Sequence, residues 1–315
     1  MKMLPVVPAH QLVSICEQQR WLIEGLWAEQ AVGIVGGEPK SFKTFLALDM
    51  AVAVASGAPC LGHFRIPSPG RVVLYAAEDS PATVRERLEG ISLAAGRALP
   101  ELDIQVITAP TLRLDLTDDC QKLTATVAQL RPRLLILDPF VRLHRKSEND
   151  SSEVAPLLAY LRELQRQYQV AVTVVHHARK GADGARAGQA LRGSSEFHAW
   201  GDSNLYLRRR SERLVLTVEH RAAAAMADLA VSLCTGPGLA LRAVAEPAAP
   251  EPAAASSLPD KVEAVLAQSP QPLRFAELRQ ACRIRTARLC SVLDEMARQG
   301  RVHKTPAGYS LVTAA

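Results

Sequence analysis

The 315-residue sequence lacks three patterns that would indicate a membrane protein or an oxidising compartment. Its apolar runs are interrupted too soon to span a bilayer. Its first twenty residues have no charged head followed by a long apolar stretch, as a signal peptide would have. The six cysteines are scattered without CxxC spacing or histidine partners, which argues against a zinc site or a disulfide framework. We therefore expect a cytoplasmic protein with no membrane partner.

Positive charge is concentrated near the C-terminus. The whole chain carries a net charge of +5 at pH 7. Residues 256–315 contain nine Lys and Arg against five Asp and Glu, so that this segment alone carries +4 and the first 255 residues only +1. Such an excess of basic side chains favours a polyanionic partner for the C-terminal segment.

The most informative segment is GIVGGEPKSFKT, from Gly33 to Thr44. It follows an apolar run and precedes TFLALDMAVAVA, which has helical apolar spacing. A glycine-rich turn between a strand and a helix is the context of a phosphate-binding loop, whose backbone N–H groups surround a polyphosphate. We predict that Lys43 reaches the outer phosphates and that Thr44 is a ligand of Mg²⁺. The residues predicted to bind ATP are Gly37, Glu38, Pro39, Lys40, Ser41, Phe42, Lys43 and Thr44.

Phe42 departs from the GxxxxGKT consensus, which has glycine at this position. A left-handed backbone at a bulky residue costs roughly 1–2 kcal/mol. Charge-assisted hydrogen bonds to phosphate, each worth roughly 1.5–3 kcal/mol, can offset that cost. We expect Lys43 to lie on a solvent-facing turn. The alternative is a Gly/Lys turn that occurs by chance.

Apolar strand-like segments alternate with helical segments before residue 245. We expect strands at Ala31–Val35, Arg71–Ala76, Ile104–Ile107, Leu134–Leu137 and Ala171–Val175. We expect helices at Thr44–Ala55, Pro81–Ala95, Asp119–Leu130 and Ser152–Tyr168. This alternation predicts an α/β fold with a mostly parallel sheet covered on both faces. Shorter strands at Asn204–Arg208, Leu214–Glu219, Ala230–Leu233 and Leu239–Val244 predict an antiparallel extension.

A Pro/Ala/Glu-rich stretch at residues 245–257 predicts an extended linker. It separates an N-terminal segment (1–28) and an ATPase domain (29–244) from a small domain (258–315). In the small domain we expect helices at Asp260–Ala267, Phe275–Cys282 and Thr286–Gln299 and a hairpin in RVHKTPAGYSLV. This order is typical of a winged helix. Arg285 and Arg288 on the third helix and Lys304 on the wing would contact DNA. The alternative is a winged helix that binds protein or covers the core.

Carboxylates follow two of the expected strands. RLLILDPF ends in Asp138, where an aspartate typically supports the Mg²⁺ of a P-loop nucleotide; otherwise it only starts a turn. RVVLYAAEDS places Glu78 and Asp79 just past a strand, at the sheet edge where ligands bind in open α/β folds. We predict that Glu78 deprotonates the water that attacks the γ-phosphate and that Asp79 caps the next helix.

Histidine and arginine side chains follow two further strands. His176 and His177 end a strand, and neighbouring strand residues point to opposite faces, so both cannot bind one metal ion. We therefore favour a sensor of the γ-phosphate over a zinc site. Arg221, in VEHRAA, can contact a nucleotide held by a neighbouring subunit. It can equally be an ordinary surface arginine.

Six separated motifs together resemble a known family. They are WLIEGLW, GGEPKSFKT, YAAEDS, LILDPF, VVHHARKG and ALRGSSEFHAWGDS. Their order is similar to that in the RecA-like ATPases related to hexameric plasmid replicative helicases of the RepA type. The resemblance covers about Gln19 to Ala224. The winged helix lies outside it.

The resemblance implies a RecA-like core that uses ATP and Mg²⁺. Its catalytic residues would be Lys43, Glu78, His177 and Arg221. Its metal-supporting residues would be Thr44 and Asp138. Glu78 would activate water, His177 would sense the γ-phosphate, and Arg221 would be an arginine finger given to the neighbouring subunit.

Two basic loops would line the centre of such a ring. RLHRKSENDSSE follows Asp138, and ARKGADGARAGQALRGSS follows His177. Neither contains an aromatic side chain for base stacking, so their hold on a single strand would be electrostatic. The alternative is a pair of solvated loops. The predicted DNA contacts are Arg142, Arg145, Lys146, Arg179 and Lys180.

These features lead to one principal hypothesis and two alternatives. We expect a homo-oligomeric ring, a hexamer by the resemblance, that acts as a helicase or translocase in mobile-element DNA replication. Single-stranded DNA would pass through the ring, and duplex DNA would bind the winged helix. One alternative is a DNA-bound regulatory or loader ATPase that does not unwind DNA. The other is a nucleotide-sensing ATPase whose winged helix binds protein.

Overall fold

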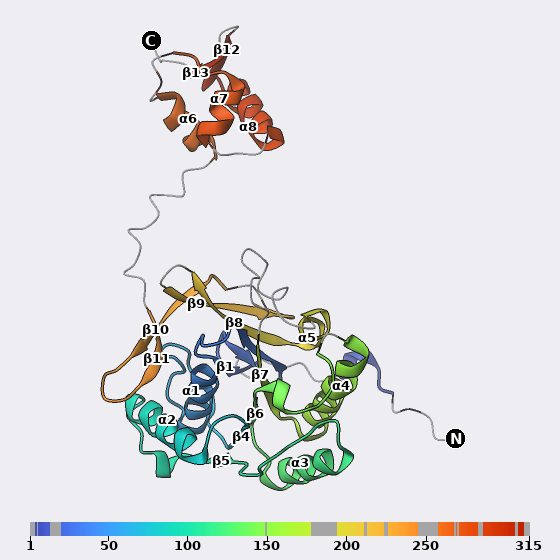
Figure 1. Ribbon diagram of the computed structural model, residues 1–315. Coiled ribbons are helices and arrows are strands. Elements are labelled where there is room, and N and C mark those ends of the chain that lie inside the picture. Colours follow the sequence, from blue (N-terminus) through green and yellow to red (C-terminus); the bar gives the residue numbers. More distant parts are fainter. Residues whose placement is uncertain are drawn as a thin grey trace. The chain divides into compact units, whose positions relative to one another are not determined.

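The computed structural model describes two compact units, Met1–Ala245 and Glu246–Ala315, which we treat separately (Figure 1). The described residues are 4, 6–12, 20–148, 150–177, 194–210, 213–223, 226–244, 258–267, 269, 271–282, 286–305 and 308–311. The linker expected at 245–257 lies outside them. Among the described residues, no helix is both long enough and apolar enough to cross a bilayer.

A nine-stranded sheet forms the centre of the first unit, in the order β11-β10-β9-β8-β3-β7-β6-β4-β5. Its strands are β3 (Val32–Gly37), β4 (Val72–Ala76), β5 (Ile104–Val106), β6 (Leu134–Asp138), β7 (Ala171–His177), β8 (Ser203–Arg210), β9 (Arg213–His220), β10 (Leu229–Cys234) and β11 (Ala240–Ala243). The neighbouring strands β5, β4, β6, β7, β3 and β8 pair in parallel. Strand β9 pairs antiparallel with β8, and β10 and β11 continue the antiparallel pairing. The expected mostly parallel sheet with an antiparallel extension is confirmed.

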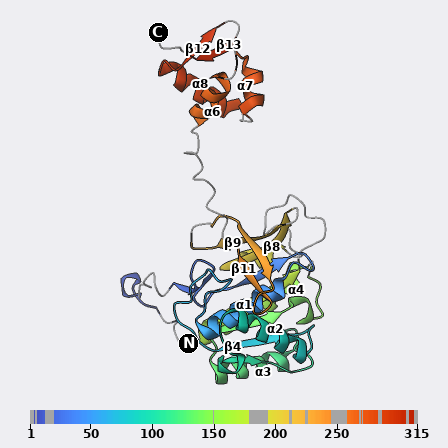
Figure 2. The ribbon, with the colours of Figure 1, turned by 90° about the vertical axis from the view of Figure 1, so that its left-hand side faces the viewer.

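Helices cover both faces of this sheet. They are α1 (Lys43–Ser56), α2 (Pro81–Ala94), α3 (Thr117–Leu130), α4 (Ser151–Tyr168) and α5 (Ser194–Trp200). Short 3-10 helices lie at Ala9–Gln11, Leu99–Glu101 and Phe140–Arg142. Helices α1 and α2 pack together on one face, and α3 and α4 lie on the other (Figures 1 and 2). Alternate residues of β4 enter the two resulting cores, which explains why the parallel strands are apolar along their whole length.

A hairpin that the sequence patterns did not predict lies before the sheet. It comprises β1 (Trp21–Ile23) and β2 (Trp27–Ala28). Leu22 and Trp27 are fully buried in the core that contains α1. The Ala28 N–H also donates to Ser203 Oγ at 3.1 Å. The core of the first unit therefore includes residues that we had assigned to the N-terminal segment.

The second unit has its own apolar core. Its elements are α6 (Leu258–Ala267), α7 (Phe275–Cys282), α8 (Thr286–Arg298), β12 (Val302–Thr305) and β13 (Gly308–Leu311). A bridge between Leu273 and Tyr309 joins the chain before α7 to the hairpin. Arg301 Nε donates to Glu263 Oε1 at 2.6 Å. Three helices followed by a hairpin is the expected order.

A buried carboxylate connects α1 to the antiparallel extension. Asp49 Oδ2 accepts hydrogen bonds from the Leu61 N–H (2.6 Å) and from Cys60 Sγ (3.1 Å), and its Oδ1 lies 3.8 Å from Arg242 Nη1 on β11. Burial raises the pKa of Asp49 to about 6, although the Leu61 N–H, Cys60 and Arg242 oppose the shift. The folded protein therefore binds this proton more tightly than the unfolded chain, whose Asp pKa is about 3.9.

Asp49 should make the stability of the first unit depend on pH. Its protonated form favours folding below about pH 4, and this contribution is lost as the pH rises through about 6. The free energy of unfolding of Asp49→Asn, relative to wild type, should therefore increase by about 1–3 kcal/mol between about pH 4.5 and 7.5. Denaturant titrations of both proteins at each pH measure it. A difference that does not change with pH would contradict the assignment.

Candidate functional site

The phosphate-binding loop connects β3 to α1 through a tight turn. Ser41 Oγ and Lys43 Nζ both donate to the Glu38 carbonyl oxygen, at 2.8 and 2.6 Å. A Cβ on Gly37 would lie 2.3 Å from the Leu207 carbonyl oxygen, so β8 leaves no room for a side chain there. No side chain caps the start of α1 at Phe42. Its first N–H groups are therefore available to an anion, as a polyphosphate site requires.

Lys43 is not on a solvent-facing turn, and the expectation was wrong. Only 4% of the residue is exposed, because it begins α1 beneath the loop. Burial lowers the pKa of Lys43 to about 8, while Asp138, Glu78 and Glu38 partly oppose that shift by stabilising the ammonium form. The ammonium group thus lies among carboxylate and carbonyl oxygens at the site.

Asp138 and Thr44 bring two oxygen ligands together. Asp138 ends β6, is 6% exposed, and accepts a hydrogen bond from the Thr44 side chain. Burial raises the pKa of Asp138 to about 6; Asp79 and Glu78 add to the shift, and Thr44 and Lys43 oppose it. A hydroxyl and a carboxylate are ligands that Mg²⁺ takes beside substrate phosphates. The residues therefore fit a Mg²⁺–nucleotide.

Glu78 follows β4 at the same edge of the sheet. The register pairs Ala76 with Asp138, so the ends of β4 and β6 are adjacent. Glu78 is about half exposed, and its Oε1 accepts from Arg142 Nε at 2.8 Å. Its charge acts on both Lys43 and Asp138. A carboxylate next to the phosphate site can accept a proton from water.

Asp79 does not cap α2, contrary to the prediction. Ser80 is the N-cap, and its Oγ accepts from the Thr83 N–H at 3.1 Å. Asp79 instead forms an ion pair with Arg87, eight residues later and in the second turn of the helix. A serine immediately before Pro81 was a capping signal that the sequence offered.

The two histidines at the end of β7 have different surroundings. His177 pairs in register with Gly37, the last residue before the loop. His176 is buried, and its ring stacks on Phe197 of α5 with centroids 4.2 Å apart. His177 therefore ends β7 beside the loop and is partly exposed, whereas the ring of His176 is enclosed against α5. Within the described part of the chain, no group of three or more His, Cys, Asp or Glu is arranged to hold a metal ion.

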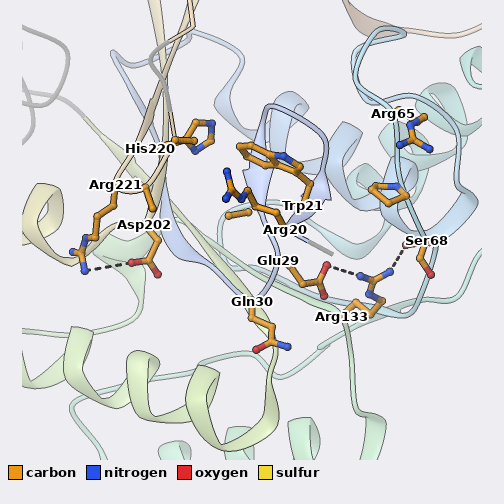
Figure 3. A pocket seen from close by; sticks show the side chains of 14 residues that line it. Arg20, Trp21, Glu29, Gln30, Arg65, Ser68, Arg133, Asp202, His220 and Arg221 are labelled. Atoms are coloured by element: carbon orange, nitrogen blue, oxygen red, sulfur yellow. Dashed lines mark hydrogen bonds and ion pairs between the residues drawn. The ribbon is translucent and has the colours of Figure 1, made fainter. Parts of the chain in front are cut away.

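Arg221 lies at the opposite edge of the sheet from the loop. It follows β9, whose end pairs with the start of β8. Its Nη1 is 3.4 Å from Asp202 Oδ1 (Figure 3). Asp202 also accepts from Arg162 Nη1 at 2.5 Å. The six residues of β3 separate the two edges, a length of about 20 Å at 3.3 Å per residue. Arg221 cannot reach the nucleotide of its own chain.

A cavity of about 980 Å³ opens beside Arg221. Figure 3 shows Arg20, Arg65 and Arg133 around it, together with Trp21 and His220. Arg133 pairs with Glu29 at 2.5 Å, and Arg65 pairs with Glu24 at 2.6 Å. No sequence pattern identifies Glu24 and Glu29 as the partners of Arg65 and Arg133, because they lie 41 and 104 residues away from them in the chain.

The predicted DNA contacts are described only in part. Arg142, Arg145 and Lys146 follow β6 and form ion pairs with Glu78, Asp115 and Glu153. Lys304 lies on β12, with its ammonium 5.9 Å from the Tyr309 ring centroid. Arg179, Lys180, Arg285 and the side chain of Arg288 lie outside the described residues.

A strand–loop–helix turn on a mostly parallel, doubly covered sheet is the arrangement of a P-loop ATPase. The chain belongs to the AAA domain family, which it matches over residues 2–183. Its fold is also similar to the crystal structure of a KaiC-like protein from the hyperthermophilic archaeon Pyrococcus horikoshii. That similarity covers 70% of this chain and 93% of the other, with 15% identity and a TM-score of 0.47.

Phe42 has a left-handed backbone, the case whose cost the sequence raised. Its φ and ψ are 64° and 25°. The ring packs edge-on against Phe45 with centroids 6.1 Å apart, and the guanidinium of Arg209 lies 6.0 Å from its centroid. These contacts favour the aromatic ring and offset part of the backbone strain.

Two substitutions at Phe42 should separate backbone strain from ring packing. Phe42→Ala removes the ring and keeps the Cβ, whereas Phe42→Gly removes both. The glycine variant should be more stable than the alanine variant by about 1 kcal/mol, the opposite of the order in an ordinary helix. Denaturant unfolding measures the difference. An alanine variant of equal or higher stability would show that this backbone is unstrained.

Proposed function

We propose that this ATPase acts on DNA as a ring-forming helicase or translocase in mobile-element DNA replication. The observation that carries the proposal is the basic loop after Asp138, which contains Arg142, Arg145 and Lys146. It begins at the nucleotide site and pairs with Glu78 there. A single strand of DNA bound to this loop would therefore lie next to Glu78 and the nucleotide site.

The residues at the loop would divide the reaction among them. Lys43 donates to the outer phosphates, and the N–H groups of α1 hold the others. Thr44 and Asp138 would hold Mg²⁺, which would supply positive charge to neutralise the phosphates. Glu78 orients and deprotonates the attacking water. His177, at the end of β7, contacts the γ-phosphate.

We propose that Arg221 acts on the nucleotide of a second copy of the chain. Its distance from its own loop supports this role. Asp202 supports it further, because its carboxylate holds the half-exposed guanidinium of Arg221 at the surface of the unit and is itself paired with Arg162. In a ring, hexameric by the resemblance of the sequence motifs, the edge that carries Arg221 would face the phosphate-binding loop of the neighbouring chain.

The second unit is proposed to be a winged helix that binds duplex DNA. Its three helices and hairpin support this assignment, as does the net charge of +4 on residues 256–315. This separate basic unit also favours a second candidate function, a DNA-bound regulatory or loader ATPase that does not unwind DNA. A nucleotide-sensing ATPase with a protein-binding winged helix is the remaining alternative.

Glu78→Gln tests the proposal through both hydrolysis and strand separation. The variant should still bind Mg-ATP, because the phosphate cradle is intact, but its ATP turnover should fall by about 10²–10⁴-fold. Wild type should hydrolyse ATP faster with single-stranded DNA and should displace a strand from a forked duplex, whereas the variant should displace none.

The same experiment separates the alternatives. DNA-stimulated hydrolysis without strand displacement by wild type would favour the regulatory or loader ATPase. Hydrolysis that neither single-stranded nor duplex DNA changes would favour the nucleotide-sensing ATPase. Wild-type turnover by Glu78→Gln would exclude Glu78 as the base.

A further inference from the structure

The contact between Arg142 and Glu78 joins two parts of the chain that are 64 residues apart. Arg142 ends the 3-10 helix that follows Asp138, and the first residue of that helix, Phe140, is fully buried. Arg113 Nη1 donates to the Arg142 carbonyl oxygen at 2.6 Å. The backbone of Arg142 is therefore anchored on two sides, and its side chain extends from a fixed point to the carboxylate.

The hydrogen bond from Arg142 opposes catalysis by the base. Its Nε occupies Oε1 of Glu78, one of the two oxygens that could accept the proton from water. It also holds the carboxylate in one orientation. Glu78 must therefore lose or weaken this contact before it acts as a base at full strength.

The pair is also accessible to a competing anion. The side chains of Arg142 and Glu78 are 60% and 45% exposed. Ion pairs this exposed are weak and are easily exchanged. The guanidinium fork matches a phosphate as well as it matches a carboxylate. A phosphate that approaches the loop from solvent can therefore take Arg142 away from Glu78.

We propose that Arg142 is a positioning residue that restrains Glu78 until a phosphate of single-stranded nucleic acid binds Arg142. The contact between Arg142 and Glu78 would keep ATP hydrolysis slow in the absence of single-stranded nucleic acid. When nucleic acid occupies the loop, the contact would break and Glu78 would be free to act as the base. This inference rests on the proposed function, since it takes Glu78 as the base and the loop after Asp138 as the strand-binding element.

Arg142→Ala should separate basal from strand-stimulated hydrolysis. Without nucleic acid, its kcat for ATP should exceed that of wild type by about two- to fivefold, the factor that corresponds to about 0.4–1 kcal/mol at 1.4 kcal/mol per tenfold. An oligo(dT) strand should stimulate wild type but should accelerate the variant little. The KM for ATP should stay the same, because the restraint acts on the base. Arg142→Lys, which keeps the charge without the fork, should be intermediate.

Arg85→Ala is the matched control. Arg85 Nε pairs with Glu89 Oε1 at the same 2.8 Å, and both side chains are exposed on α2. Removing it should change neither basal nor stimulated turnover. Raising the salt concentration should screen the Arg142–Glu78 pair and so narrow the difference in kcat between wild type and Arg142→Ala. A purely structural role of Arg142 would not give this salt dependence.

Two results would overturn the inference. A basal kcat of Arg142→Ala at or below that of wild type would show that Arg142 does not restrain the base. Undiminished stimulation of this variant by oligo(dT) would show that the strand acts elsewhere. Failure of the proposed function gives different results: Glu78→Gln would then turn over ATP as fast as wild type, or oligo(dT) would leave the turnover of wild type unchanged.

Discussion

The parallel pairing of β3 with β7 and β8, and of β6 with β4 and β7, determines where the chemistry of this protein lies. Parallel strands end at one edge, so the segments that follow β3, β4, β6 and β7 meet there although they are far apart in sequence. Every residue assigned to phosphate, metal or water lies in one of those segments. The antiparallel strands begin beyond β8, and β9 runs back along β8 and carries Arg221 to the opposite edge.

Burial at this edge creates an electrostatic problem that a bound nucleotide would solve. Lys43 and Asp138 are both buried. Burial lowers the pKa of Lys43 and raises the pKa of Asp138, and both shifts favour the neutral form. Each stabilises the charge of the other, and neither is fully compensated. A polyphosphate would stabilise the ammonium of Lys43, and Mg²⁺ would stabilise the carboxylate of Asp138. The site thus favours a ligand that brings a negative charge to Lys43 and a positive charge to Asp138, as Mg-ATP would.

Most of the fold could be predicted because its signals are local. Apolar runs that alternate with segments of helical apolar spacing identified the parallel strands and their helices. The sequence raised the left-handed backbone at Phe42 only as a possibility, and the structure shows it. The burial of Lys43 could not be predicted, since it depends on how β3, β6 and α1 pack together. The ion pairs of Arg142 with Glu78 and of Arg221 with Asp202 depend equally on tertiary structure. The hairpin at Trp21–Ala28 was missed because its strands are too short to show a period.

Mg-ATP binding by wild type and Lys43→Ala tests the central claim most directly. Equilibrium titration should show affinity for the variant that is about 10- to 100-fold weaker, because one charge-assisted contact to the phosphates is lost. Lys122→Ala, an exposed lysine on α3, should bind as wild type does. Thermal unfolding should show that both variants remain folded. Equal affinity of folded Lys43→Ala and wild type for Mg-ATP would contradict the assignment of this loop as the nucleotide site.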